Sequence, residues 1–304
     1  KVKDLGLFGT AQSAVNVIQP AKIQGSVELH VSPSGSDENN GSLEAPFYTI
    51  TKALSYVEAL NNLDVKGIVI YLHEGTYVAS ETISLNKTHS GKNNIPVIIS
   101  AYNNEKVVIT GGTDIAGDKF TKVTDEAILN RLQASVRDRV MVVDLKALGI
   151  SEFGSIATGR FGGPNYSVTM NGESLTLARY PDATTIPLGE VSDPGSIVDP
   201  SSTGVEYVME DSRPKLWYND GNIWRYGNLG GEWYKMHNRV AEIRTGKNTI
   251  KLEGSDTRVP VSEEKRTHYY YNILEELNVP GEYYIDAATG KLYLYPIGDM
   301  DSAT

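Results

Sequence analysis

Between residues 47 and 60, apolar side chains recur with the period of an α-helix. The intervals are three or four residues, at Phe47, Ile50, Leu54, Val57 and Leu60. This spacing places the side chains on one face of a helix, and the hydroxyl of Thr49 is a favourable N-cap. We therefore predict an amphipathic helix over residues 49–60.

Short apolar runs bracketed by glycine and proline surround this helix. They cover residues 28–31, 67–72, 81–85, 96–102 and 106–110. Runs of this length with such punctuation are typical of β-strands. The last four runs follow one another too closely for the helical crossover of an ordinary parallel sheet. Two arrangements stay open: antiparallel hairpins, or a right-handed parallel β-helix whose strands stack rung on rung. A helix before the first rungs favours the β-helix, because its open end is a sheet edge that needs a cover.

From residue 117 onward the pattern changes to a short helix followed by hairpins. The helix is predicted over residues 124–132, with Thr124 as its cap, and a strand over 140–145. Asn171-Gly172 between two apolar runs is a strong hairpin signal. Hairpins are predicted in three places, over residues 168–177, 241–252 and 282–295. The pattern indicates an antiparallel, sandwich-like β domain.

The predicted fold class is therefore mainly β. It is the start of a right-handed parallel β-helix with an N-terminal capping helix, plus an antiparallel β-sandwich-like domain. We expect a leader or linker over residues 1–26, the capping helix and first rungs over 27–116, and the antiparallel β-rich domain over 117–304.

Composition excludes several classes of function. The 304 residues include no cysteine, so disulfides, thiolate metal sites and a cysteine nucleophile are absent. A formal net charge of -10 argues against nucleic acid and anionic membranes as partners, and it weakens the case for a uronate polymer as substrate. No apolar run approaches the ~20 residues of a membrane-spanning helix. There are 18 tyrosines against 5 phenylalanines, and tyrosine suits both strands and wet binding surfaces.

One set of segments resembles the opening of secreted right-handed β-helix carbohydrate-active enzymes. It comprises residues 29–37, 40–50 and 52–54, followed by 73–77 and 107–112. Lyases and hydrolases share this opening, so it bears on the fold more than on the reaction.

A second set of segments is similar to glycoside hydrolase family 141 and its relatives. It comprises residues 171–182, 272–277, 280–286 and 289–296. The resemblance implies a β-helix that is interrupted by a β domain and then continues through rungs that hold the catalytic carboxylates. Those rungs would follow Pro296, where this sequence soon stops. We therefore expect the N-terminal part of a secreted or cell-surface bacterial glycoside hydrolase that acts on plant or microbial polysaccharide. The remaining rungs would be its structural partner, this chain alone would be inactive, and no catalytic residue is assigned.

The richest aromatic stretch runs from residue 217 to residue 234 and holds all three tryptophans. Sugar C–H faces stack on aromatic rings, and charged side chains bond sugar hydroxyls. The candidate glycan-binding residues are Trp217, Asp220, Trp224, Arg225, Glu232, Trp233 and Tyr234. The alternative is that these aromatic rings fill the core of the β domain, where most aromatic residues pack.

Candidate cofactor sites are few. The five histidines are scattered, and no metal-binding or nucleophile motif is present. The loop Asp37-Glu38-Asn39-Asn40-Gly41, with Glu44 beyond it, offers the oxygen ligands that calcium favours, but a solvated turn explains it equally. We expect no cofactor, with calcium in this loop as the exception.

Two further functions stay open. One is a non-catalytic carbohydrate-binding or adhesion module. The other is a polysaccharide lyase, which must neutralise a uronate carboxylate with calcium or clustered basic residues before a proton is removed. The sequence shows no evident basic cluster.

Overall fold

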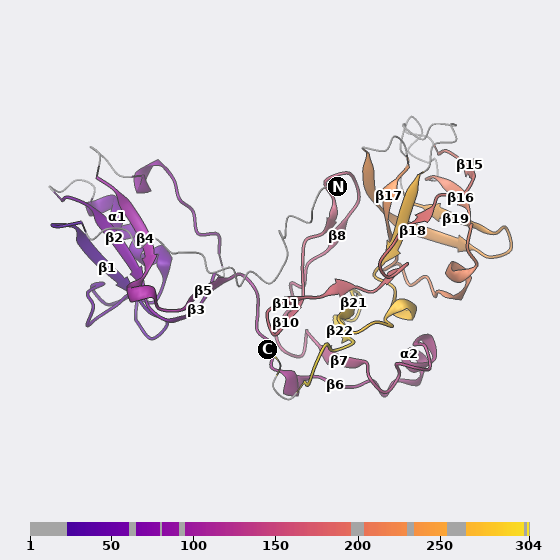
Figure 1. The fold of residues 1–304 in the computed structure, drawn as a ribbon, viewed down its shortest axis with the longest axis horizontal. Coiled ribbons are helices and arrows are strands. Elements are labelled where there is room, and N and C mark those ends of the chain that lie inside the picture. Colours follow the sequence, from indigo (N-terminus) through magenta and orange to yellow (C-terminus); the bar gives the residue numbers. More distant parts are fainter. Residues whose placement is uncertain are drawn as a thin grey trace. The chain divides into compact units, whose positions relative to one another are not determined.

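The computed structural model describes residues 23–60, 65–79, 81–90, 95–195, 204–229, 234–253, 266–300 and 303. The chain divides into two compact units, Lys1–Asp114 and Ile115–Thr304, which are described separately below as the first and second unit. Both are built mainly from short strands with few helices (Figure 1). In the described part of the chain, no helix has the length and apolar character needed to cross a bilayer.

The first unit consists of parallel strands and one helix. Its elements are β1 (Val27–Val31), α1 (Ile50–Leu60), β2 (Ile68–Leu72), β3 (Gly75–Val78), η1 (Lys87–His89), β4 (Val97–Ala101), η2 (Tyr102–Asn104) and β5 (Val107–Thr110). β1, β2 and β4 form one parallel sheet in that order, and β3 pairs in parallel with β5. Parallel pairing, not hairpins, therefore connects the short strands of this region.

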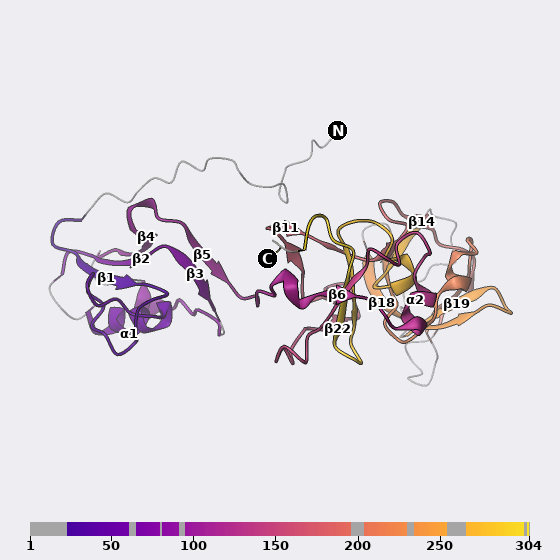
Figure 2. The same ribbon diagram turned by 90° about the horizontal axis from the view of Figure 1, so that it is seen from below.

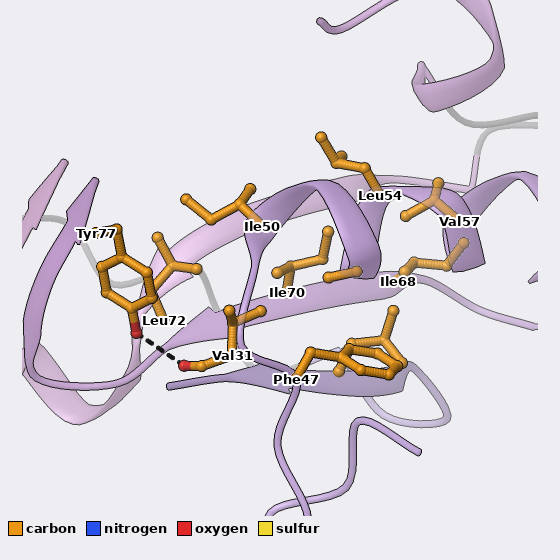
Figure 3. Close-up of a cluster of buried hydrophobic side chains, with 11 residues drawn as sticks. Val31, Phe47, Ile50, Leu54, Val57, Ile68, Ile70, Leu72 and Tyr77 are labelled. Atoms are coloured by element: carbon orange, nitrogen blue, oxygen red, sulfur yellow. Dashed lines mark hydrogen bonds between the residues drawn. The ribbon is translucent and has the colours of Figure 1, made fainter. Parts of the chain in front are cut away.

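The core of the first unit lies between its three-stranded sheet and α1, which lies along β1 and β2 (Figure 2). Ile50, Leu54 and Val57 of the helix pack toward Ile68 and Ile70 of β2 (Figure 3). The predicted helix is confirmed, with its first residue at position 50. The hydroxyl of Thr49 accepts the backbone N–H of Lys52 at 3.1 Å, as the capping argument expects.

One predicted strand of this unit is wrong. Residues 81–85 form no strand, and the strand after β2 is β3. Tyr77 explains the difference, because its ring enters the core and its hydroxyl donates to the carbonyls of Val31 and His73, each at 2.8 Å. In the 81–85 segment Ile83 packs against this core without forming a strand, and Leu85 is exposed.

The second unit contains two larger sheets. The five-stranded sheet has the order β12 (Thr176–Leu177), β21 (Glu282–Asp286), β22 (Lys291–Leu294), β7 (Met141–Asp144) and β6 (Thr121–Lys122). The eight-stranded sheet runs β13 (Arg179–Tyr180), β20 (Thr267–Tyr271), β17 (Trp224–Asn228), β18 (Lys235–Arg244), β19 (Thr249–Leu252), β16 (Glu206–Val208) and β15 (Val191–Asp193), with β14 (Ile186–Pro187) also on β20. Antiparallel pairing prevails, and among the strands that the structure describes in this unit only β12 and β21 pair in parallel.

Smaller elements complete the second unit. They are η3 (Gly117–Lys119), α2 (Glu126–Arg131), β8 (Ile156–Ala157), β9 (Gly163–Pro164), β10 (Thr169–Met170), β11 (Glu173–Ser174), η4 (Arg213–Leu216) and η5 (Leu274–Glu276). The predicted hairpins are confirmed, and Asn171 and Gly172 have the positive φ of 54° and 80° that their turn requires. The cap of α2 is Asp125, not the predicted Thr124, because the Asp125 carboxylate accepts two backbone N–H groups.

Side chains from both sheets meet in one hydrophobic core. Leu177, Tyr283 and Leu292 come from the five-stranded sheet, and Trp224 and Tyr271 from the eight-stranded one. A separate core beneath α2 contains Tyr284 and Tyr293. Much of the tyrosine excess therefore packs in the interior.

Candidate functional site

The structure buries both described tryptophans of the predicted glycan-binding stretch. Trp217 is 6% exposed and lies 5.1 Å, between ring centroids, from Tyr270. Its indole N–H donates to Glu276. Trp224 is 8% exposed and belongs to the core that the two sheets share. Neighbouring side chains cover both rings, so the alternative of core packing describes their positions better than an exposed stacking face.

Arg225 is also interior. Its guanidinium is wholly buried and donates to the carbonyl oxygens of Gly227 and Asn228 at the end of β17. Burial lowers the pKa of this guanidinium from its ordinary value. Arg225 therefore holds backbone in place and is not presented to a ligand, which corrects the prediction for this residue.

The other candidates have different positions. Glu232 and Trp233 lie outside the described residues. Tyr234 is half-buried, and the guanidinium of Arg160 lies 5.4 Å from the centre of its ring. For these three residues glycan contact stays a prediction.

Asp220 is the predicted residue that takes part in a partly accessible polar cluster. Its Oδ2 accepts from Nη1 of Arg131 at 2.9 Å and from the hydroxyl of Tyr284 at 2.8 Å. Nε of Arg131 donates to Oε1 of Glu275 at 2.7 Å, and Nη2 to Oε2 of the same carboxylate at 3.3 Å. We call Arg131, Tyr218, Asp220, Glu275 and Tyr284 the Asp220 cluster.

Four elements position the Asp220 cluster. Arg131 is the last residue of α2, Glu275 lies in η5 and Tyr284 in β21. Asp220 sits in the turn after η4, where its Oδ1 accepts the backbone N–H of Asn222 at 3.0 Å. The turn and the end of α2 thus bring Arg131 to Asp220, 89 positions away in sequence, and to Glu275, 144 positions away.

The electrostatics of the cluster hold its protons in place. Burial opposes the charge of Arg131, but Glu275 and Asp220 outweigh it and raise the pKa of the guanidinium. Burial, reinforced by the charge of Asp220, also raises the pKa of Tyr284, so its hydroxyl stays a donor. Both carboxylates are engaged by one arginine, which suits recognition of hydroxyl groups better than proton transfer to a leaving group.

Tyr218 gives the cluster an exposed aromatic face. Its side chain is 64% exposed, and the guanidinium of Arg131 lies 5.2 Å from the ring centre. Its backbone N–H donates to Oε1 of Glu275 at 3.0 Å. A tethered, exposed ring beside charged hydrogen-bonding groups is an arrangement on which a sugar ring can stack.

A second pair of carboxylates lies deeper and was missed at the level of the sequence. Glu276 is 1% and Glu282 4% exposed. Asn278 links them, because its backbone N–H donates to Glu282 at 3.0 Å and its side chain to Glu276 at 3.4 Å. Burial raises the pKa of Glu282 to about 7 and that of Glu276 above its ordinary value. For Glu276 the signal in the sequence was its place, with Glu275, between Leu274 and Leu277 in an apolar segment. Glu282 carries no comparable signal.

The loop predicted as a calcium candidate uses its first carboxylate to support α1. Asp37 accepts the backbone N–H groups of Tyr48 and Thr49, each at 2.9 Å, and the Thr49 hydroxyl at 2.8 Å. Burial acts to raise the pKa of Asp37, but these hydrogen bonds outweigh it and lower the pKa. Within the described ranges, no three His, Asp or Glu side chains gather in a metal-binding arrangement.

Comparison with known proteins gives partial matches. No established protein-family profile matches the chain. It is 40% identical over 83 residues to the uncharacterized protein YwoF of Bacillus subtilis and 34% identical over 107 residues to the pectate lyase PEL9 of Emericella nidulans. These matches cover 27% and 34% of this chain but only 15% and 24% of those proteins.

Among solved structures, the chain resembles one titled glycoside hydrolase, with a TM-score of 0.65 and 19% sequence identity. The match covers 90% of this chain and 44% of the other. At this identity the likeness is one of fold. Nearly the whole chain therefore has a fold that recurs within a longer protein.

Proposed function

We propose that this chain is the N-terminal part of a secreted or cell-surface bacterial β-helix glycoside hydrolase that acts on plant or microbial polysaccharide. The observation that carries the proposal is the fold that nearly the whole chain shares with part of a longer glycoside hydrolase. The parallel pairing of β2 with β4 and of β3 with β5 supports the β-helix, because the chain runs β2, β3, β4, β5 and so places each later strand beside the strand two before it, as successive rungs would.

The last strands of the first unit support a continuation into further rungs. Among the described residues, β4 pairs only with β2, and β5 only with β3. Ile99 of β4 is 37% exposed, whereas its register partner Ile70 is 0% exposed. Ile109 of β5 is 52% exposed, whereas its partner Tyr77 is 7% exposed. Apolar side chains on an unpaired parallel edge are what a following rung would cover.

In this proposal the two parts of the protein have different tasks. The catalytic carboxylates belong to the later rungs, and this chain contributes a glycan contact at the Asp220 cluster. Tyr218 would stack on a sugar ring, while Asp220 and Arg131 would bond its hydroxyls. This chain by itself is expected to show no turnover.

A polysaccharide lyase is the second candidate, because one stretch of the chain is similar to a pectate lyase. The two reactions leave different products. A hydrolase releases reducing ends on saturated sugars, whereas a lyase leaves an unsaturated sugar that absorbs in the ultraviolet.

The decisive experiment uses the full-length natural protein on a broad panel of neutral and acidic polysaccharides. New reducing ends without ultraviolet absorbance support the hydrolase, and absorbance at the new chain ends replaces it with the lyase. Binding without turnover would make the protein an adhesion module. A natural reading frame that ends at Thr304 would overturn the proposed later rungs.

A further inference from the structure

A pocket of about 240 Å³ lies in the first unit, beside the start of α1. Its lining comes from Pro33 after β1, from residues 48–51 at the start of α1, and from β3 and the segment that follows β3 as far as Ile83. The volume lies just below the ~300–1,000 Å³ of sites for drug-sized ligands, so the pocket suits one small unit such as a single sugar residue.

β3 presents an open edge to this pocket. The backbone N–H groups of Gly75 and Ala79 donate to carbonyls at and just before β5, at 3.1 and 2.7 Å. Successive residues of a strand bond toward opposite edges, so the N–H groups of Thr76 and Val78 point away from β5. Among the described strands only β5 pairs with β3, and no β5 residue lines the pocket. The pocket therefore runs along the open edge, where backbone groups can bond a ligand.

The base of the pocket is apolar. The ring of Tyr77 is 7% exposed, and its hydroxyl is already bonded to the carbonyl of Val31 (Figure 3). Ile50, which is buried, and Ile83, which packs against the same core, also line the pocket. The base can therefore cover C–H groups of a ligand without leaving a polar side-chain atom of its own unpaired.

The rim of the pocket combines an exposed aromatic ring with polar groups. Tyr48 is 54% exposed, and its backbone N–H donates to Oδ1 of Asp37 at 2.9 Å. The exposed hydroxyls of Thr51 and Thr76 and the exposed carboxylate of Glu81 also belong to the lining. Among the described residues that line the pocket, Glu81 alone is charged. A carboxylate accepts hydrogen bonds from sugar hydroxyls but repels an acidic sugar.

These features suit a sugar better than a peptide. A ring that can stack, an apolar base and groups that bond hydroxyls are the parts of a saccharide site. Strand addition by a peptide takes its affinity from a row of main-chain hydrogen bonds, and the four residues of β3 direct only Thr76 and Val78 to the open edge.

We propose that this pocket binds one residue of a neutral polysaccharide, with the ring of Tyr48 stacked on the sugar and the carboxylate of Glu81 bonding its hydroxyls. The backbone groups of Thr76 and Val78 bond further hydroxyls. The inference rests on the proposed function in one respect, namely that the ligand is a saccharide. It adds a second glycan contact, which lies in the first unit, and a preference for neutral over acidic sugars.

The test maps binding on this chain by the NMR shifts of its backbone amides. The probes are three neutral trisaccharides (xylotriose, cellotriose and mannotriose), the acidic trigalacturonate, and an extended tetrapeptide of alternating threonine and valine. We expect at least one neutral trisaccharide to shift the amides of Thr76 and Val78, and trigalacturonate to bind there at least about tenfold more weakly. The proposal is overturned if no neutral trisaccharide shifts these amides, or if trigalacturonate or the peptide binds there most tightly.

Variants test the two side chains named in the proposal. Tyr48→Ala should raise the dissociation constant of the neutral trisaccharide at least about fivefold through loss of stacking, whereas Tyr48→Phe keeps the ring and should retain binding. Glu81→Gln should reduce the preference over trigalacturonate, because it removes the repelling charge. Phe161→Ala removes a ring of the second unit that is 93% exposed, and as the matched control it should leave the shifts of Thr76 and Val78 unchanged.

Two results would overturn the assignment of these side chains. One is unchanged sugar binding in Tyr48→Ala, with the amide signals of β1 and β2 showing that the first unit is folded. The other is an unchanged preference for the neutral sugar in Glu81→Gln.

The outcome is separable from that of the proposed function. Turnover of polysaccharide by the full-length protein, together with no sugar at the amides of Thr76 and Val78, would remove the pocket and leave the hydrolase standing. Sugar binding that depends on Tyr48, together with no turnover by the full-length protein, would do the reverse.

Discussion

Replacement of Glu282 by glutamine isolates the cost of one buried charge. Glu282 begins β21, is 4% exposed, and its Oε2 accepts the backbone N–H groups of Asn278 and Val279, each at 3.0 Å. Burial raises its pKa to about 7 from an ordinary value of 4.5, even though those hydrogen bonds act to lower it. Glutamine has the same shape, carries no charge and keeps a carbonyl oxygen to accept both N–H groups, but it loses the longer bond of 3.4 Å that Oε1 accepts from the backbone N–H of Arg179.

The magnitude follows from linkage between protonation and folding. The folded protein binds this proton more tightly than the unfolded chain does. The stabilisation is therefore complete below about pH 4.5 and is lost as pH rises through about 7. A difference of about 2.5 pKa units, at about 1.4 kcal/mol each, amounts to roughly 3.5 kcal/mol. We expect Glu282→Gln to be more stable than wild type by up to about 3.5 kcal/mol at pH 8, and equally stable at pH 4.

The assay is urea unfolding followed by tryptophan fluorescence between about pH 4 and pH 8. All three tryptophans follow residue 114, so the signal reports the second unit. Burial lowers the pKa of His237 and His268, which makes the unit less stable as pH falls below 6.5. Both proteins share this opposing trend, so it cancels when the free energy of unfolding of wild type is subtracted from that of the variant at each pH. A difference that does not change with pH, or a variant less stable than wild type at pH 8, would refute the reasoning.

Three other predictions concern single side chains. Burial and the neighbouring His73, whose Nε2 lies 3.0 Å from Nδ1 of His30, lower the pKa of His30. The first unit should therefore lose stability as pH falls below 6.5, and the loss should be smaller in His30→Gln. Hydrogen exchange of the β1 and β2 amides measures this stability at each pH. The same pH dependence in variant and wild type would contradict the prediction. Arg131→Met leaves the two carboxylates of the Asp220 cluster without their cation. Because these ion pairs are largely buried, the free energy of unfolding in urea should fall by about 2–4 kcal/mol. A fall of less than about 1 kcal/mol would disprove this. Tyr218→Ala should weaken glycan binding at least about fivefold without changing the melting temperature, since the ring is 64% exposed. Phe161→Ala, which removes a ring that is 93% exposed, is its matched control, and equal losses of binding in both variants would rule out a specific role for Tyr218.

The parts of the site that could be predicted were those with a local cause. Asp220 was found because it sits in an aromatic turn, and its turn geometry depends on near neighbours. Arg131 lies 89 residues from Asp220 and 144 residues from Glu275, so nothing in the sequence indicates that it bridges these two carboxylates. Trp217, which ends η4, and Trp224 in β17 are buried although they lie in the same aromatic stretch, since aromatic composition does not say which rings neighbouring side chains cover.

The sequence by itself determined the elements whose cause lies within a few residues. Apolar spacing and Thr49 specified α1, and Asn171-Gly172 specified a hairpin, because backbone preference and side-chain period act locally. Only the tertiary structure decided that the early strands pair in parallel and that Glu282 holds a proton near neutral pH. These features depend on burial and on which distant strands become neighbours, and both are properties of the packed chain.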